Sequence, residues 1–209
     1  MRILDGVDLR VSKGETVAIV GTSGAGKSTL LGLLAGLDEP SSGKVWLAGQ
    51  ELTAMDEDGR AALRAERVGF VFQSFHLISS LTALENVMLP LELSGAESAH
   101  DAALTAIRTV GLEPRKGHYP HQLSGGEKQR VAIARAFVVQ PDVLFADEPT
   151  GNLDQRTGEN IVELLFRMNR ESGTTLVLVT HDLDLASRCN RILFMEAGRI
   201  ERESGPVEA

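Results

Sequence analysis

A glycine-rich segment near the N-terminus has the residue types and the spacing that bind phosphate. It reads Gly21-Thr22-Ser23-Gly24-Ala25-Gly26-Lys27-Ser28-Thr29, between an apolar run and a helical pattern. The glycines let the backbone curl so that its N–H groups face phosphate oxygens, and the helix N-terminus adds partial positive charge. In such a phosphate-binding loop, Lys27 reaches the β- and γ-phosphates and the Ser28 hydroxyl binds Mg²⁺. The segment therefore predicts a site for a nucleoside triphosphate and Mg²⁺.

Two adjacent carboxylates end a second apolar run. This run covers residues 143–146, and Asp147 and Glu148 follow it. At a strand end beside the phosphate-binding loop, an acidic residue can hold Mg²⁺, usually through water, and we assign that role to Asp147. Glu148 then points past the metal and can orient or deprotonate the attacking water. A helix-capping or surface role for Glu148 stays open.

Two more polar residues follow predicted strands. His181 follows the run 174–180, and it could donate a hydrogen bond to the γ-phosphate in the crevice where such sheets bind nucleotides. Gln73 follows the run that ends in Phe72, and it suits a contact to Mg²⁺ or to the attacking water. The alternatives are a packed or solvated histidine and an ordinary polar loop residue.

A second glycine segment, Leu123-Ser124-Gly125-Gly126-Glu127, opens another predicted helix. Two glycines at a helix start present free N–H groups to an anion. Because the loop at 21–28 already surrounds one set of phosphates, this second helix start requires either a second ligand or the nucleotide of a second subunit.

The remaining pattern supplies the strands and helices that must position these residues. Strands that alternate with helices imply a mainly parallel sheet, and the helix-rich middle of the chain predicts an inserted lobe. Residues 82–139 are expected to be mostly helical, with breaks at Pro90, Gly95, 111–114 and Pro120. We expect strands at about 3–11, 16–20, 45–47, 68–72, 143–146, 174–179, 191–195 and 199–201, and helices at about 28–37, 56–66, 155–171 and 182–188.

Length and composition suit one globular domain. The chain has 209 residues, of which 43% are hydrophobic and 24% charged. Its net charge of −8 argues against nucleic acid as the main partner, because phosphate backbones require basic patches. No apolar run approaches the roughly 20 residues that span a bilayer, and we expect no signal peptide. The single Cys189 excludes an internal disulfide and is expected to be small and partly buried.

Taken together, these motifs resemble the ATP-binding subunits of ABC transporters over essentially the whole chain. The resemblance implies an α/β fold with a P-loop NTPase (RecA-like) core on a mainly parallel sheet, a small antiparallel β subdomain and an inserted α-helical subdomain. It implies a single ATP-binding domain over 1–209, with its core at about 1–73 and 140–209 and its helical subdomain at about 74–139. The matching segments are 21–28, Gln73, 123–127, 143–148, Asn152-Leu153-Asp154 and His181.

The resemblance also implies a reaction and a dimer. Members of this family hydrolyse ATP, with Mg²⁺, as head-to-tail dimers that hold two ATP molecules at their interface. In this chain, each ATP would lie between one subunit's loop 21–28 and the partner's Ser124, Gly125 and Gly126, with Glu127 beside them. Asp154 would face the partner's site. The expected metal-site residues are Ser28, Gln73 and Asp147, and the expected catalytic residues are Glu148, His181 and Gln73.

A narrower resemblance concerns a membrane partner. Segments 71–75, 81–87 and 147–154 are similar to lipoprotein-release, MacB-type and FtsE-type ATPases, which serve permeases with large periplasmic domains. This implies a peripheral subunit at the cytoplasmic face of a bacterial inner membrane. A groove near Phe75, Leu77 and 81–91 would receive an FtsX- or MacB-like permease, unless these residues form the core of the helical lobe. The alternative function is a regulatory ATPase that signals through its permease to a periplasmic enzyme without transporting a substrate.

Two departures from the family pattern bear on the site. Such ATPases usually stack an aromatic ring on adenine from a segment upstream of 3–11, whereas no aromatic residue precedes Trp46 here. We expect Trp46 in the core or at the surface of a small sheet. Glu127 replaces the commoner glutamine.

Other classes fit less well, because 74–122 is too short for the coiled coil of a chromosome-maintenance ATPase and ribosome-acting members carry two cassettes.

Overall fold

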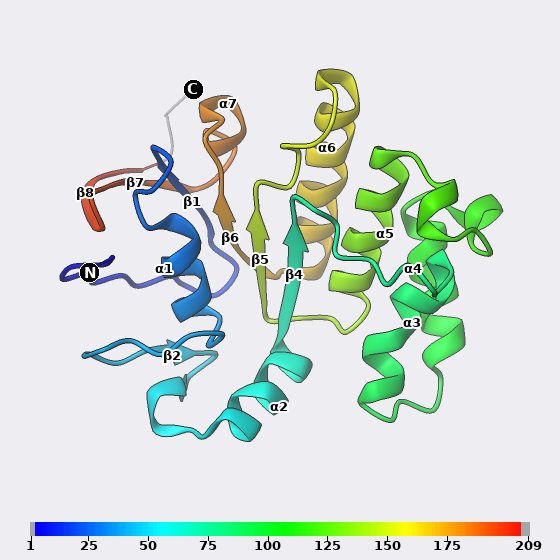
Figure 1. Ribbon diagram of the computed structural model, residues 1–209, viewed down its shortest axis with the longest axis horizontal. Coiled ribbons are helices and arrows are strands. Elements are labelled where there is room, and N and C mark those ends of the chain that lie inside the picture. The colour runs from blue at the N-terminus through cyan, green and yellow to red at the C-terminus, as the bar shows by residue number, and fades with distance from the viewer. Residues whose placement is uncertain (1–2, 206–209) are drawn as a thin grey trace.

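A six-stranded sheet runs through the middle of the molecule (Figure 1). The computed structural model describes residues 3–205. The strands lie in the order β4-β5-β6-β1-β7-β8, and all neighbouring pairs are parallel except the antiparallel pair β7–β8. The prediction of a mainly parallel sheet is confirmed. The strands are β1 (Thr16–Gly21), β4 (Val68–Phe72), β5 (Val143–Asp147), β6 (Thr175–Val179), β7 (Arg191–Glu196) and β8 (Arg199–Ser204).

Helices flank this sheet on both sides, and a small antiparallel hairpin lies near α1 and α2 (Figure 1). The hairpin consists of β2 (Trp46–Leu47) and β3 (Gln50–Glu51). Short 3₁₀ turns occur at Leu52–Ala54, Glu113–Arg115 and Pro120–Gln122. The α-helices are α1 (Lys27–Leu34), α2 (Glu57–Arg67), α3 (Ala83–Leu93), α4 (Ala99–Thr109), α5 (Gly125–Phe137), α6 (Gln155–Ser172) and α7 (Leu183–Ala186).

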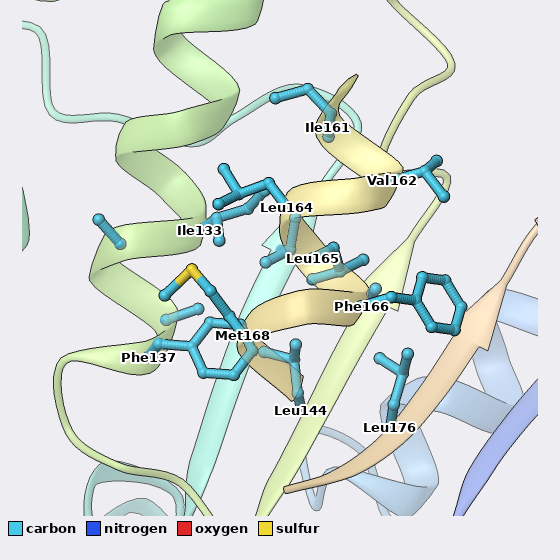
Figure 2. Packing of buried hydrophobic residues seen from close by; sticks show 14 of the residues in the cluster. Ile133, Phe137, Leu144, Ile161, Val162, Leu164, Leu165, Phe166, Met168 and Leu176 are labelled. Carbon is cyan, nitrogen blue, oxygen red and sulfur yellow. The ribbon is translucent and has the colours of Figure 1, made fainter. Parts of the chain in front are cut away.

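Side-chain alternation along the strands divides the core into two layers. On one face, Leu144 of β5 and Leu176 of β6 pack with α5 and α6; Figure 2 shows Leu144 near Phe137 and Met168, and Leu176 near Phe166. On the other face, alternate strand residues pack with α1; they include Val17, Ile19, Phe145, Val177 and Val179. Strands that are buried on both faces read as continuous apolar runs, which is the pattern that predicted β1, β5 and β6.

Helices α3 and α4, together with α5, form the helix-rich side of the molecule, at the right of Figure 1. Helix α3 begins with a capping box in which Thr82 and Glu85 bond each other's backbone N–H groups. The expected break at Pro90 is wrong, because α3 continues through it to Leu93. One proline removes a single N–H donor, and here the capped first turns and the buried Val87 hold the helix. The division into a core and a helical subdomain stays a prediction.

The segment 3–11 is not a strand, so that expectation is wrong. Its apolar side chains still turn inward, since Leu4, Val7, Leu9 and Val11 pack against the core layer that contains α1. The backbone instead meets the β7–β8 turn, where Asp5 N–H donates to the Gly198 carbonyl at 3.0 Å. The alternation of apolar and polar residues therefore indicated which side chains face the core. A β-strand also requires a neighbouring strand that pairs with its backbone.

Three further sequence-based expectations concern Trp46, Cys189 and membrane-spanning segments. Trp46 lies at the surface of the small hairpin with 57% of its area exposed, and Lys44 Nζ lies 5.8 Å from the centroid of its ring. Cys189, which was expected to be partly buried, is buried. Across residues 3–205, no helix combines the length and the apolar character that crossing a membrane requires.

Candidate nucleotide-binding and catalytic site

The sequence-predicted site residues follow the carboxyl ends of four neighbouring strands. The loop 21–28 follows β1, Gln73 follows β4, Asp147 and Glu148 come at the end of β5, and His181 comes after β6. These strands are adjacent and parallel, so their carboxyl ends meet at one edge of the sheet. In open α/β sheets this edge is where ligands bind.

The loop 21–28 is shaped by two of its glycines and closed by its lysine. A Cβ at Gly21 would collide with the carbonyl oxygen of Met195 on β7, and Gly26 has a left-handed φ of 96° as the N-cap of α1. Lys27 Nζ donates to the carbonyls of Gly21 at 2.7 Å and Thr22 at 3.0 Å, so its ammonium lies within the loop. Thr22, Ser23, Gly24 and Ser28 are exposed, Ala25 is buried and Thr29 is half-buried.

Ser28 and Asp147 come together although 119 positions separate them in the chain. The Ser28 hydroxyl donates to Asp147 Oδ2 at 3.2 Å. Burial raises the pKa of the Asp147 carboxyl, while the Ser28 bond and the Lys27 charge act in the opposite direction. Hydroxyl and carboxylate oxygens are ligands that Mg²⁺ prefers, so these two residues fit the expected metal.

Glu148 is paired with the histidine that follows the neighbouring strand. His181 Nδ1 lies 2.8 Å from Glu148 Oε1, and the Thr180 hydroxyl donates to Glu148 Oε2 at 3.4 Å. The backbone of Glu148 is left-handed at a φ of 46°, and its N–H donates to the Val179 carbonyl at 2.9 Å. Backbone strain of this kind gathers at functional sites. Glu148 is thus turned toward β6, with only 19% of its side chain exposed.

Gln73 contacts the loop that follows Glu148. Gln73 Nε2 donates to Asn152 Oδ1 at 3.1 Å, and Asn152 Nδ2 donates to the Gln73 carbonyl at 3.0 Å. Asp154, two residues on, caps α6 by accepting from Thr157 N–H at 3.0 Å, and its bonds with Thr157 lower the pKa of its carboxyl. In the sequence analysis, Asn152 was included in a matching motif but was given no role. Its role depends on contact with Gln73, which lies far away in the sequence, so the local pattern did not indicate it.

The segment 123–127 forms the start of α5. Ser124 is its N-cap, and Glu127 Oε2 accepts from the Ser124 N–H at 2.9 Å and from the Ser124 hydroxyl at 3.0 Å. The Ser124 backbone N–H lowers the pKa of the Glu127 carboxyl, which also receives Arg115 Nε at 3.2 Å. A Cβ at Gly126 would lie 2.5 Å from Thr157 Cγ2, so the start of α5 packs closely on the start of α6. Gly125 lies beside Leu153.

The helices that follow the two glycine segments pack on opposite faces of the sheet. Helix α1, which starts in the loop 21–28, packs Leu30 and Leu31 into one core layer. Helix α5, which starts after Ser124, packs Val131 and Ile133 into the other. Figure 1 shows α1 and α5 on opposite sides of β4, β5 and β6.

Two side chains of α5, which sequence reasoning missed, hold the loops around the site. Gln129 is fully buried and donates from Nε2 to the Pro149 carbonyl at 2.6 Å. Arg135 donates to the carbonyls of Phe75 at 3.0 Å and His76 at 2.6 Å, and burial lowers the pKa of its guanidinium. Both carbonyls belong to residues with left-handed φ, at 61° and 47°. The available signal was a polar residue on the buried face of an amphipathic helix.

The expected groove near Phe75 is partly occupied by the protein's own packing. Leu77, Leu84 and Met88 pack against the core layer of α5, which supports the core alternative for these three. Ile78 remains 41% exposed and Leu93 79% exposed. The groove itself stays a prediction.

Comparison with known proteins yields close matches. The family model described as ABC transporter matches residues 4–151. The chain is 60% identical over 206 residues to the uncharacterized ATP-binding protein YbbA of Escherichia coli (strain K12), covering 98% of this chain and 90% of that protein. It is 52% identical to the lipoprotein-releasing system ATP-binding protein LolD of Xanthomonas axonopodis pv. citri (strain 306), covering 98% and 84%. A dimeric post-hydrolysis structure of the cassette MJ0796 with ADP and Pi matches with a TM-score of 0.90 at 42% identity, covering 99% and 92%.

Proposed function

Because the chain belongs to the ABC transporter family as an ATP-binding subunit, we propose that it hydrolyses ATP at sites shared by two head-to-tail copies and so drives a membrane permease. The family resemblance and the α/β cassette fold expected from the sequence are both confirmed. The catalytic roles, the permease and the location at the inner membrane are parts of the proposal.

The observation that carries the proposal is the meeting of two pairs at one sheet edge, Ser28 with Asp147 and Glu148 with His181. Ser28 and Asp147 would hold Mg²⁺, with Gln73 as a third oxygen ligand. Mg²⁺ bound there would neutralise charge on the phosphate oxygens. Lys27 would turn from its own loop carbonyls to the β- and γ-phosphates, since both are acceptors for its ammonium.

Glu148 is the proposed base. Its carboxylate would take a proton from the attacking water while the water oxygen forms a bond to the γ-phosphorus and the bond to ADP breaks. A carboxylate only accepts hydrogen bonds, so the proton in the 2.8 Å contact lies on His181 Nδ1. The other ring nitrogen, Nε2, can then donate to a phosphate only in the doubly protonated ring. His181 thereby orients Glu148 in either protonation state.

The positions of the helices that follow the two glycine segments support a site shared by two copies. In a subunit that holds phosphates at the start of α1, the helix α5 that begins after Ser124 packs on the other face of the sheet. A second copy would supply the latter group, and the MJ0796 match is described as dimeric, which supports this arrangement. Asp154 lies in the loop next to this helix start, where it would face the partner.

The proposed membrane partner is a permease of the FtsX or MacB type with a large periplasmic domain. Support comes from LolD, whose name describes a lipoprotein-releasing system. The exposed Ile78 and Leu93 offer apolar contacts on the helix-rich side. The regulatory alternative uses the same cassette, and identification of the permease that co-purifies with the protein would separate the two functions.

Replacement of the base tests the hydrolytic proposal. Glu148→Gln keeps the size of the side chain but cannot accept a proton, so we expect ATP binding near the wild-type level and turnover lower by at least about 100-fold. The control is Glu163→Gln, an exposed position on α6, which should turn over ATP normally. Steady-state ATPase assays and equilibrium binding measure both. A Glu148→Gln protein that hydrolyses ATP at a near-normal rate would remove Glu148 from the mechanism.

A further inference from the structure

Gln73 is exposed, and its amide has two chemically different ends. Only the oxygen can bind a cation, because the nitrogen carries two hydrogens and no free lone pair. An amide that turns freely would present the wrong end part of the time. A metal ligand of this type therefore needs a neighbour that fixes its orientation.

Asn152 is that neighbour, and the donors and acceptors in its two contacts with Gln73 fix the orientation of both side-chain amides. The Gln73 backbone carbonyl can only accept, so the Asn152 group that meets it at 3.0 Å must be Nδ2. Asn152 Oδ1 is then the end that faces the Gln73 side chain. An oxygen acceptor there requires a donor, so Gln73 Nε2 occupies that contact at 3.1 Å. The Gln73 amide oxygen is left outside the pair.

Gly151 makes room for this arrangement. A Cβ at Gly151 would lie 2.7 Å from Gln73 Nε2 and 3.0 Å from Gln73 Cδ. The Gln73 side chain thus lies directly across the Gly151 backbone, and any larger residue would push it away. Gly151 and Asn152 therefore act on the Gln73 side chain independently. Gly151 leaves room for it by lacking a Cβ, and Asn152 fixes its orientation through hydrogen bonds.

We propose that Asn152 is a positioning residue that turns the Gln73 amide so that its oxygen, and not its nitrogen, is free to bind Mg²⁺. This rests on the proposed function, in which Gln73 is a ligand of the metal. The residue also links two loops, because Asn152 lies two positions before the α6 cap Asp154 and holds the first residue after β4. A displacement of either loop would therefore change the orientation of the Gln73 amide.

The test measures how much Mg²⁺ strengthens binding of the non-hydrolysable analogue AMP-PNP, as the ratio of the Kd in EDTA to the Kd in Mg²⁺. Asn152→Ala and Gly151→Ala should each lower this ratio by about tenfold, as is common for partners of metal ligands. The Kd in EDTA should stay at the wild-type value, which separates metal positioning from loss of fold. The control is Asn160→Ala. The Asn160 side chain donates to the carbonyl of Arg156 on the same helix, so this variant should leave the ratio unchanged.

Gln73→Ala distinguishes the two levels of the proposal. We expect it to lower the ratio at least as much, and Asn152→Ala should add nothing further in the Gln73→Ala background. An unchanged ratio in Gln73→Ala would remove Gln73 from the metal site and overturn the inference with it. A lowered ratio in Gln73→Ala but wild-type ratios in Asn152→Ala and Gly151→Ala would overturn the positioning role alone. Additive losses of the ratio in the Gln73→Ala/Asn152→Ala double variant would also overturn the positioning role alone.

Discussion

At the scale of single residues, the site is a set of short polar contacts between loops far apart in sequence. Ser28 meets Asp147, His181 meets Glu148, and Gln73 meets the Asn152 loop. In the proposed mechanism, these pairs would face the nucleotide, the metal and the attacking water. Residue type and strand-end position were sufficient to predict most of these residues. Their pairings were not predictable, because they depend on which loops the sheet order brings together.

The metal site should respond to pH through Asp147. Burial raises the pKa of this carboxyl, and Mg²⁺ binds its ionised form, so protons should compete with the metal at a higher pH than at an ordinary aspartate. Between about pH 7 and about pH 5, the wild type should lose more Mg²⁺-dependent AMP-PNP affinity than Asp147→Asn does. Titrations at both ends of the range measure this. Equal losses in the two proteins would show that Asp147 does not titrate at the metal.

At the scale of elements, α5 connects the helix-rich side to the loops that follow β4 and β5. Its first residue follows the N-cap Ser124, its middle holds the Pro149 carbonyl through Gln129, and Arg135 holds the strained turn at Phe75 and His76. A shift of this helix would therefore move both loops that follow β4 and β5. The helix and its apolar face were predictable from periodicity, whereas the roles of its buried polar residues required the positions of the loops.

Arg135 should contribute more stability than an exposed arginine. Arg135→Met keeps an unbranched apolar side chain but removes two charge-assisted hydrogen bonds, so the free energy of unfolding should fall by about 2 kcal/mol. Arg108, in an exposed ion pair with Glu113, is the matched position, and Arg108→Met should change the free energy of unfolding much less, because solvent screens an exposed ion pair. Urea denaturation measures both. Equal losses at the two positions would mean that Arg135 does not hold the turn.

At the scale of the whole molecule, the sequence predicted the parallel sheet, its helices and the first strand of the small hairpin, and the family resemblance implied that this small subdomain is antiparallel. It failed at the segment 3–11 and at Pro90, for two different physical reasons. Alternation along 3–11 recorded burial but not strand pairing, and the break expected at Pro90 ignored the packing that carries α3 past it. The sheet order, which places α1 and α5 on opposite faces, is a long-range property that local pattern does not contain.

The central claim is that each ATP lies between the loop 21–28 of one copy and the α5 start of another. Light scattering of the Glu148→Gln protein with ATP, with and without Ser124→Arg, tests it most directly. We predict an ATP-dependent dimer for Glu148→Gln, and a monomer that still binds ATP when Ser124→Arg is added, because Arg fills the start of α5 but not the loop. Ser94→Arg, at the exposed end of α3, should leave the dimer intact. A stable ATP-bound dimer despite Ser124→Arg would contradict the shared site.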